Sequence, residues 1–185
     1  MPGRAPGGDT GHGHFFAAFR KFGAASKLDG NKPRMIAEDL RHAADHRVLH
    51  VEIMESVGGP LVPDAAAAAG PLAPDQLERF LDRLAADPRW PEIVDEGRQT
   101  LARRDRAARA LLGCDRADPP PACAVSYRFL AQVNRTMAPA RVLAELAAAF
   151  AIAAGDPRIA GINLVAPEDH PVARADYALH MRMVR

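Results

Sequence analysis

Three apolar, strand-like segments end in side chains that are well placed to do chemistry. The first group is Glu52, Met54 and Glu55, the second is Asn134 and Arg135, and the third is residues 163–169. Because the active sites of parallel α/β barrels lie at the carboxyl ends of their strands, we expect a site on this rim. Carboxylates such as Glu52 and Glu168 could move protons there, although the sequence alone does not pair them. The alternative is that polar residues simply begin each loop.

Four histidines occur in pairs whose spacing could bind a metal ion. His12 and His14 form a His-x-His pair, which would place two imidazoles on the same side of a strand. The residues before this pair are rich in Gly and Pro and those after it are helical, so we expect an exposed or helix-capping pair. His42 and His46 lie one helical turn apart, but Ala43 stands where the zinc proteases have a glutamate. We therefore expect these two histidines to be exposed to solvent.

The remaining reactive side chains match no catalytic motif. His50 lies within a strand-like segment, where a packed histidine is the expected role. Ser56 and Ser126 have no base nearby in the sequence, and neither a Gly-rich phosphate loop nor a Gly-x-Ser-x-Gly elbow is present. Cys114 and Cys123 are too few for a disulfide framework and lack the spacing of a metal site. We expect them to be small thiols, buried or partly exposed.

The composition excludes several classes of protein. The 185 residues are enough for one domain or a large part of one. Lys and Arg number 24 against 23 Asp and Glu, so the charge balance indicates neither nucleic acid nor a membrane surface as partner. No segment approaches the roughly 20 apolar residues of a membrane span, and residues 1–13 lack the apolar core of a signal peptide. The compartment is undetermined: the chain as given fits the cytoplasm, and a longer parent protein could be exported.

The pattern of apolar residues predicts the elements that position these side chains. We expect residues 1–10 to be a disordered lead, and strands near 47–54, 124–134 and 159–165. Alternation along the first strand predicts a mixed polar side with Glu52 and Met54 and an apolar side with Ile53, which should pack on helices. Helices are expected over 11–25, 31–46, 74–86, 91–112, 139–154 and 171–184. The first helix places Phe15, Phe19 and Phe22 on one face, which should be buried.

Alternating strands and helices predict an α/β fold with a parallel sheet and right-handed crossovers. The firmest part is residues 122–169, a strand–helix–strand unit. Three strands are few for so many helices, and a complete (β/α)8 TIM barrel takes roughly 250 residues. We therefore expect residues 11–185 to form a partial barrel.

Four ordered stretches resemble the adenosine deaminase family of zinc amidohydrolases, especially bacterial members near its growth-factor-like branch. They are residues 11–22, 48–54, 129–135 and 161–169, the last followed by 176–181. The strongest is Gly-Ile-Asn-Leu-Val-Ala-Pro-Glu-Asp at 161–169, which is similar to the family's strand end Gly-Ile-Asp-Leu-x-Gly-x-Glu. The resemblance implies a barrel in which a zinc-bound water converts adenosine, or a related purine nucleoside, to the inosine product. The three strands here would be the second, third and fourth of that barrel.

The resemblance also implies which chemical groups this chain lacks. The family's zinc-binding His-x-His lies on the first strand, whereas His12 and His14 match the helix after it. The His-Ala-Gly-Glu motif, which holds a zinc ligand and the catalytic glutamate, would follow Arg185. Ala166 matches the glycine whose backbone meets the purine, and Glu168 lies two residues further on. We expect these two residues to be nearest the substrate.

Two functions follow as expectations. The first is a fragment of an adenosine deaminase-like hydrolase of purine metabolism, with no catalytic residue, no metal ligand and no turnover of its own. Zinc would then belong to the complete family member, and the partner would be a purine nucleoside. The second is a non-catalytic α/β module that binds nucleosides or another protein.

Overall fold

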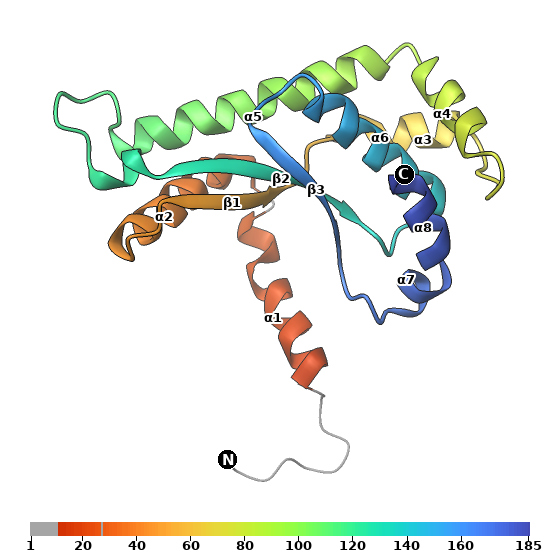
Figure 1. Ribbon diagram of the computed structural model, residues 1–185, viewed down its shortest axis with the longest axis horizontal. Coiled ribbons are helices and arrows are strands. Elements are labelled where there is room, and N and C mark those ends of the chain that lie inside the picture. Colours follow the sequence, from red (N-terminus) through yellow and green to blue (C-terminus); the bar gives the residue numbers. More distant parts are fainter. Residues whose placement is uncertain (1–10, 27) are drawn as a thin grey trace, which may run out of the picture.

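The computed structural model describes residues 11–26 and 28–185 (Figure 1). The predicted lead over residues 1–10 lies outside the described residues. The helices and strands follow in this order: α1 (Gly11–Ser26), η1 (Asp29–Asn31), α2 (Lys32–Asp45), β1 (His50–Glu55), α3 (Leu61–Ala68), α4 (Leu77–Ala85), α5 (Trp90–Leu112), η2 (Pro121–Ala124), β2 (Ser126–Asn134), α6 (Pro139–Ala153), β3 (Ile159–Val165), α7 (Pro171–Ala175) and α8 (Tyr177–Val184).

The three strands form one parallel sheet in the order β1-β2-β3. Its register places His50 beside Ser126 on the first pair of strands and Val133 beside Leu164 on the second. The predicted α/β fold with a parallel sheet is confirmed, and β3 coincides with the strand expected over residues 159–165. Neighbours in the sheet are also neighbours in the chain, and helices connect each strand to the next.

The two faces of the sheet differ in character. On β2, Phe129, Ala131 and Val133 are buried against the helices, with exposed fractions of 0–1%. Figure 1 shows the long helix α5 running across the sheet, with α6 beside it. A side chain at Gly97 of α5 would collide with Ile152 of α6, so this glycine allows the two helices to approach closely.

The opposite side, here called the open face, carries the alternate residues of each strand. Its members are His50, Glu52 and Met54 of β1, Ser126, Arg128, Leu130 and Gln132 of β2, and Asn163 of β3. The three residues from β1 and the first two from β2 are exposed, and the other three are half-buried. A mixed polar face opposite an apolar one is the pattern predicted for the first strand, and it extends across the sheet.

The aromatic face of α1 is exposed, so the prediction of a buried face is wrong. Phe15, Phe19 and Phe22 have exposed fractions of 57%, 60% and 68%. Figure 1 shows α1 extending away from the helices that cover the sheet. Near its C-terminal end, the side chain of Asn31 donates a hydrogen bond to the carbonyl of Ala25 (3.0 Å). The helical spacing put the three rings on one face, but it carries no information about what covers that face.

The first strand begins later than residue 47, where it was predicted to start. Arg47 has a φ of 58°, and the amide of Val48 donates to the carbonyl of Ala43 (2.8 Å). These two residues therefore close the C-terminal end of α2 rather than extend the sheet.

The prediction of two thiols is also wrong, because Cys114 and Cys123 form a disulfide. Cys114 follows the end of α5 and Cys123 lies in η2, and their Cα atoms are 5.6 Å apart. The short helix η2 folds the intervening loop back on itself, which the spacing in the sequence does not reveal. None of the helices in the described ranges is both long and apolar enough to cross a membrane.

Candidate functional site

The carboxyl ends of the three strands meet at one edge of the sheet, here called the rim. Glu55 ends β1, Asn134 ends β2 and Val165 ends β3, and register pairs Asn134 with Val165. This is the edge at which parallel α/β proteins bind their ligands. The predicted strand-end residues are therefore neighbours in space, although they do not all point the same way.

Glu55 turns away from the open face and belongs to a buried ion-pair network. It is 3% exposed, with its carboxylate 3.0 Å from Nζ of Lys32 and 2.9 Å from Nη1 of Arg104. Arg104 also donates to the carboxylate of Asp29 (2.6 Å), and this hydrogen bond lowers the pKa of Asp29. Glu55 thus fastens β1 to helices α2 and α5, and it is a structural residue rather than a group of the rim.

Side chains of all three strands are linked across the open face near the rim. Asn163 of β3 donates from Nδ2 to the sulfur of Met54 on β1 (3.3 Å). Gln132 of β2 donates from Nε2 to the hydroxyl of Ser56, just after β1 (3.0 Å). These contacts form a polar floor of amide groups, which can both donate and accept hydrogen bonds.

The end of β2 holds the loop that follows β3. Arg135 lies 3.2 Å from the carboxylate of Glu168, and its guanidinium also donates to the carbonyl of Leu164. Its side chain is 17% exposed, whereas that of Glu168 is 83% exposed. Asn134 is engaged locally, because its Oδ1 accepts from the amide (2.9 Å) and the hydroxyl (2.7 Å) of Thr136. Arg135 therefore positions Glu168 at the edge of the rim.

Ala166 has a left-handed backbone directly after β3. Its φ is 83°, and among the described residues other than glycine only Arg47 shares a positive φ. For a residue with a Cβ atom this conformation costs about 1–2 kcal/mol relative to the right-handed region. Glycine adopts it without that cost, so position 166 has the backbone of a glycine and the side chain of an alanine.

A cavity of about 440 Å³ lies beside the end of β3. Its polar lining includes Arg135, Asn163 and Glu168, and its apolar lining includes Leu164, Tyr177 and Met181. An apolar wall with a few convergent polar groups is the usual character of a small-molecule site.

The histidines do not join this arrangement into a metal centre. His12 contacts the carboxylate of Asp169 (3.5 Å), which brings α1 to the loop after β3. His42 contacts Glu38 (3.7 Å) and its ring stacks on that of His46. Among residues 11–26 and 28–185, no group of three or more His, Cys, Asp or Glu side chains could hold a metal ion. The described residues therefore offer no fitting site for the zinc that the family resemblance implies.

A serine–histidine contact, missed in the sequence, lies at the opposite end of the open face. His50 Nδ1 is 2.8 Å from the hydroxyl of Ser126, its register partner on β2. The carbonyl of Leu49 lies 3.1 Å from the same hydroxyl and is a second acceptor for its proton. A base-activated nucleophile donates its only proton to the base, so the hydrogen bond to Leu49 competes with that role. Only the register of the sheet, with a separation of 76 residues, reveals this pair.

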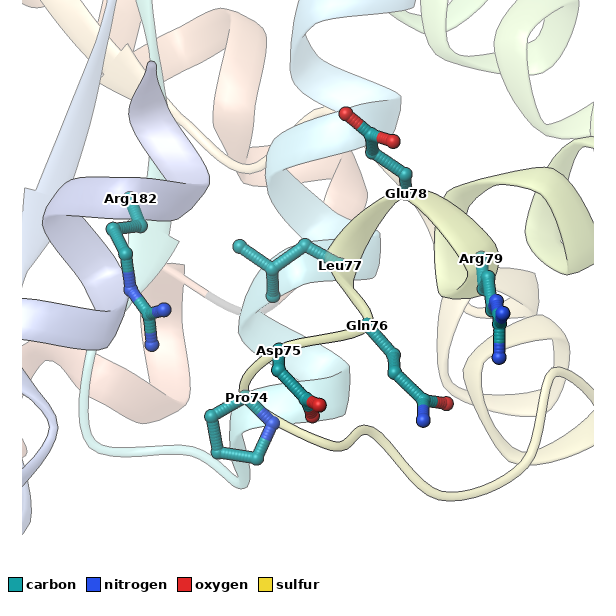
Figure 2. A pocket seen from close by; sticks show the side chains of 7 residues that line it. All are labelled: Pro74, Asp75, Gln76, Leu77, Glu78, Arg79 and Arg182. Carbon is teal, nitrogen blue, oxygen red and sulfur yellow. The ribbon is translucent and has the colours of Figure 1, made fainter.

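The hollow in Figure 2 lies between the start of α4 and helix α8, away from the rim residues described above. It has a volume of about 480 Å³ and is lined by residues 74–79 and Arg182. Figure 2 shows that its ionisable side chains point in different directions: Glu78 points upward, and Arg79 and Arg182 point downward on opposite sides of the view. The charged groups of this hollow therefore do not face one common point.

Comparison with known proteins finds no matching family model, no matching curated protein and no matching solved structure. The geometry of the rim is thus the main basis for a functional interpretation.

Proposed function

We propose that the chain forms one wall of a purine-nucleoside site of the adenosine deaminase type, with the nucleoside held at the rim. The parallel strands and the helix-covered apolar face support this proposal, because both are features of a barrel wall. The resemblance of four ordered sequence stretches to that family supplies the substrate class.

The observation that carries the proposal is the backbone of Ala166. The resemblance matches this residue to a glycine whose main chain meets the purine, and Ala166 has a φ of 83°. Ala166 directly follows β3, the strand that borders the candidate cavity. A strained conformation next to such a site is consistent with a functional constraint. The agreement is independent of side-chain identity, because it concerns the backbone alone.

The other rim residues have roles that follow from their contacts. Gln132 and Asn163 offer amide groups from the floor, which suit the hydrogen-bonding edge of a purine or the hydroxyls of its ribose. Glu168, held by Arg135, offers an exposed carboxylate at the edge. We propose that this chain contributes binding, and that the metal ligands and the catalytic glutamate come from outside these 185 residues. In a complete member of the family that the sequence resembles, zinc would supply an activated water.

Calorimetric titration of the purified chain with adenosine and with uridine tests the proposal. We expect saturable binding of adenosine and at least a roughly 10-fold weaker response to uridine, a difference of about 1.4 kcal/mol. An assay of adenosine absorbance with added zinc should show no turnover. Equal responses to both nucleosides would contradict the binding claim. Turnover that a chelator abolishes would contradict the claim that the chemical groups lie elsewhere.

One observation favours the second function, a protein-interaction module. The rings of Phe15, Phe19 and Phe22 are all exposed on α1, and Phe15 and Phe19 are in edge-on contact (5.1 Å between centroids). Exposed apolar patches often mark interaction sites. A cooperative thermal transition of a stable monomer would favour this module, and aggregation through open sheet edges would favour the partial barrel.

A further inference from the structure

We propose that the native chain carries Cys114–Cys123 as a structural cross-link, and that it therefore matures in an oxidising compartment. The cross-link concerns folding and location, and it is independent of nucleoside binding. It ties the end of α5 to the start of β2 across a sequence separation of 9 residues.

The backbone around both cysteines holds them at the separation that a disulfide needs. Helix α5 ends at Leu112 and is capped by Gly113, which has a φ of 74°, and the amide of Cys114 donates to the carbonyl of Arg109 (3.0 Å). The amide of Cys123 donates to the carbonyl of Pro120 (2.9 Å) within the turn of η2. The Cα–Cα distance of 5.6 Å lies in the middle of the range for disulfides. The cysteines are thus placed by a helix cap and a turn.

Gly113 is suited to this place for two reasons. Its positive φ favours glycine, and a Cβ atom there would lie 2.6 Å from Nε of Arg116. Glycine therefore favours the tight turn behind α5, because any other residue would carry backbone strain and displace the Arg116 side chain. A loop closed in this way holds the two cysteines at a separation that favours their oxidation.

The surroundings are those of a structural bond rather than a reactive one. Both cysteines are half-buried and pack against the core cluster. Their spacing differs from the Cys-x-x-Cys of redox enzymes, in which one thiol is kept reactive. The spacing therefore does not indicate a redox-active pair of thiols. We expect the disulfide to stabilise the folded chain.

The cross-link lies at the amino end of the sheet, opposite the rim. Ser126, the first residue of β2, follows Cys123 closely and donates its amide to the carbonyl of Leu49 (3.0 Å). Breaking the bond should therefore loosen the α5–β2 connection and leave the rim near Ala166 unchanged.

The chemistry requires an oxidant of a defined class. The two thiols lose two protons and two electrons as the S–S bond forms, and the electrons pass to the disulfide of a thiol oxidant through a mixed disulfide. That oxidant leaves as two thiols. Oxidants of this class act in secretory and periplasmic compartments, whereas the cytosol keeps thiols reduced.

Alkylation of the full chain in a bacterial host tests the proposal. The chain is made either in the cytosol or with an export signal to the periplasm, and its thiols are trapped by acid quenching and maleimide before purification. We expect no alkylated cysteine in the periplasmic chain and two in the cytosolic chain. Two free thiols in the periplasmic chain would overturn the proposal, as would a fully cross-linked cytosolic chain.

Thermal melting of the same samples gives a second readout. The cross-linked form should melt about 5–10 °C above the reduced form. The double variant Cys114→Ser/Cys123→Ser is the matched control, and it should melt with the reduced form from either compartment. Oxidised and reduced chains that melt within about 1 °C of each other would show that the bond is not structural.

Discussion

Arg135 and Glu168 lie 3.2 Å apart and join the end of β2 to the loop after β3. The two partners differ in burial: the arginine side chain is 17% exposed and the glutamate side chain 83% exposed. Arg135 also donates to the carbonyl of Leu164, next to the last residue of β3. The pair thus fixes the segment that contains Ala166. Of the two side chains, the buried arginine should contribute more to the free energy of unfolding.

Replacing Arg135 should destabilise the fold more than replacing Glu168. Arg135→Met keeps the length of the side chain but leaves the Leu164 carbonyl without this donor, and we expect a loss of about 1–3 kcal/mol in the free energy of unfolding. Glu168→Gln removes an exposed charge and should change it by less than about 1 kcal/mol. Urea unfolding followed by circular dichroism measures both. The reverse order would show that the rim loop does not depend on Arg135.

The buried carboxylate of Glu55 should be a major contributor to stability. Glu55→Gln removes the charge that faces Lys32 and Arg104, leaving two cations close together, and should destabilise the fold by about 3–5 kcal/mol. Glu52→Gln, on the exposed side of the same strand, is the control and should change stability by less than about 0.5 kcal/mol. Similar effects of the two substitutions in chemical denaturation would contradict a structural role for Glu55.

His180 should make the fold less stable in mild acid. It is 2% exposed, its Nε2 has no hydrogen-bond partner among the residues that the structure describes, and burial lowers its pKa below the usual 6.5. Nearby Asp176 raises that pKa and Arg135 lowers it, both by smaller amounts. As the pH falls below 6.5, the unfolded chain therefore binds a proton that the folded chain does not, and stability decreases until the folded pKa is reached.

Denaturation midpoints between pH 7.5 and pH 5.5 measure this effect. His180→Leu should reduce the slope, because the variant has no imidazole to protonate at this position. His46→Leu, at an exposed position, should keep the slope of the unmodified chain. An unchanged slope in His180→Leu would show that the acid sensitivity arises elsewhere.

The phenylalanines of α1 should contribute little to folding, despite their number. Phe19→Ala should change the free energy of unfolding by no more than about 0.5 kcal/mol, because the ring is largely exposed. Phe80→Ala in α4 is the contrast: its ring is fully buried, and its loss should cost about 3–5 kcal/mol. Comparable losses in the two variants would show that α1 is packed in solution.

Local patterns in the sequence predicted the elements that have a clear period. Residues 159–165 form a continuous apolar run, and they coincide with β3. The alternation along β1 placed Glu52 and Met54 on one side and Ile53 on the other, as the structure has them. The carboxyl ends of the strands were expected at one edge of the sheet because the strands were predicted to be parallel.

Contacts between residues far apart in the chain could not be predicted from the sequence. Glu55 was expected at the rim, but it pairs with Arg104, which is 49 residues away in the sequence. The spacing of apolar residues cannot predict a contact between residues so far apart. The disulfide depended on a turn between Cys114 and Cys123 that spacing does not show. The left-handed backbone of Ala166 was equally hidden, because alanine gives no signal for a positive φ.

The binding of adenosine to Ala166 variants tests the proposed nucleoside site most directly. Ala166→Val places a β-branched side chain at a positive φ, and it should weaken adenosine binding at least about 10-fold in calorimetric titration. Ala160→Val makes the same change at an exposed position of β3 and should leave binding unchanged, and Ala166→Gly should bind at least as well as the unmodified chain. Equal adenosine affinities for folded Ala166→Val and Ala160→Val would contradict a nucleoside site at this rim.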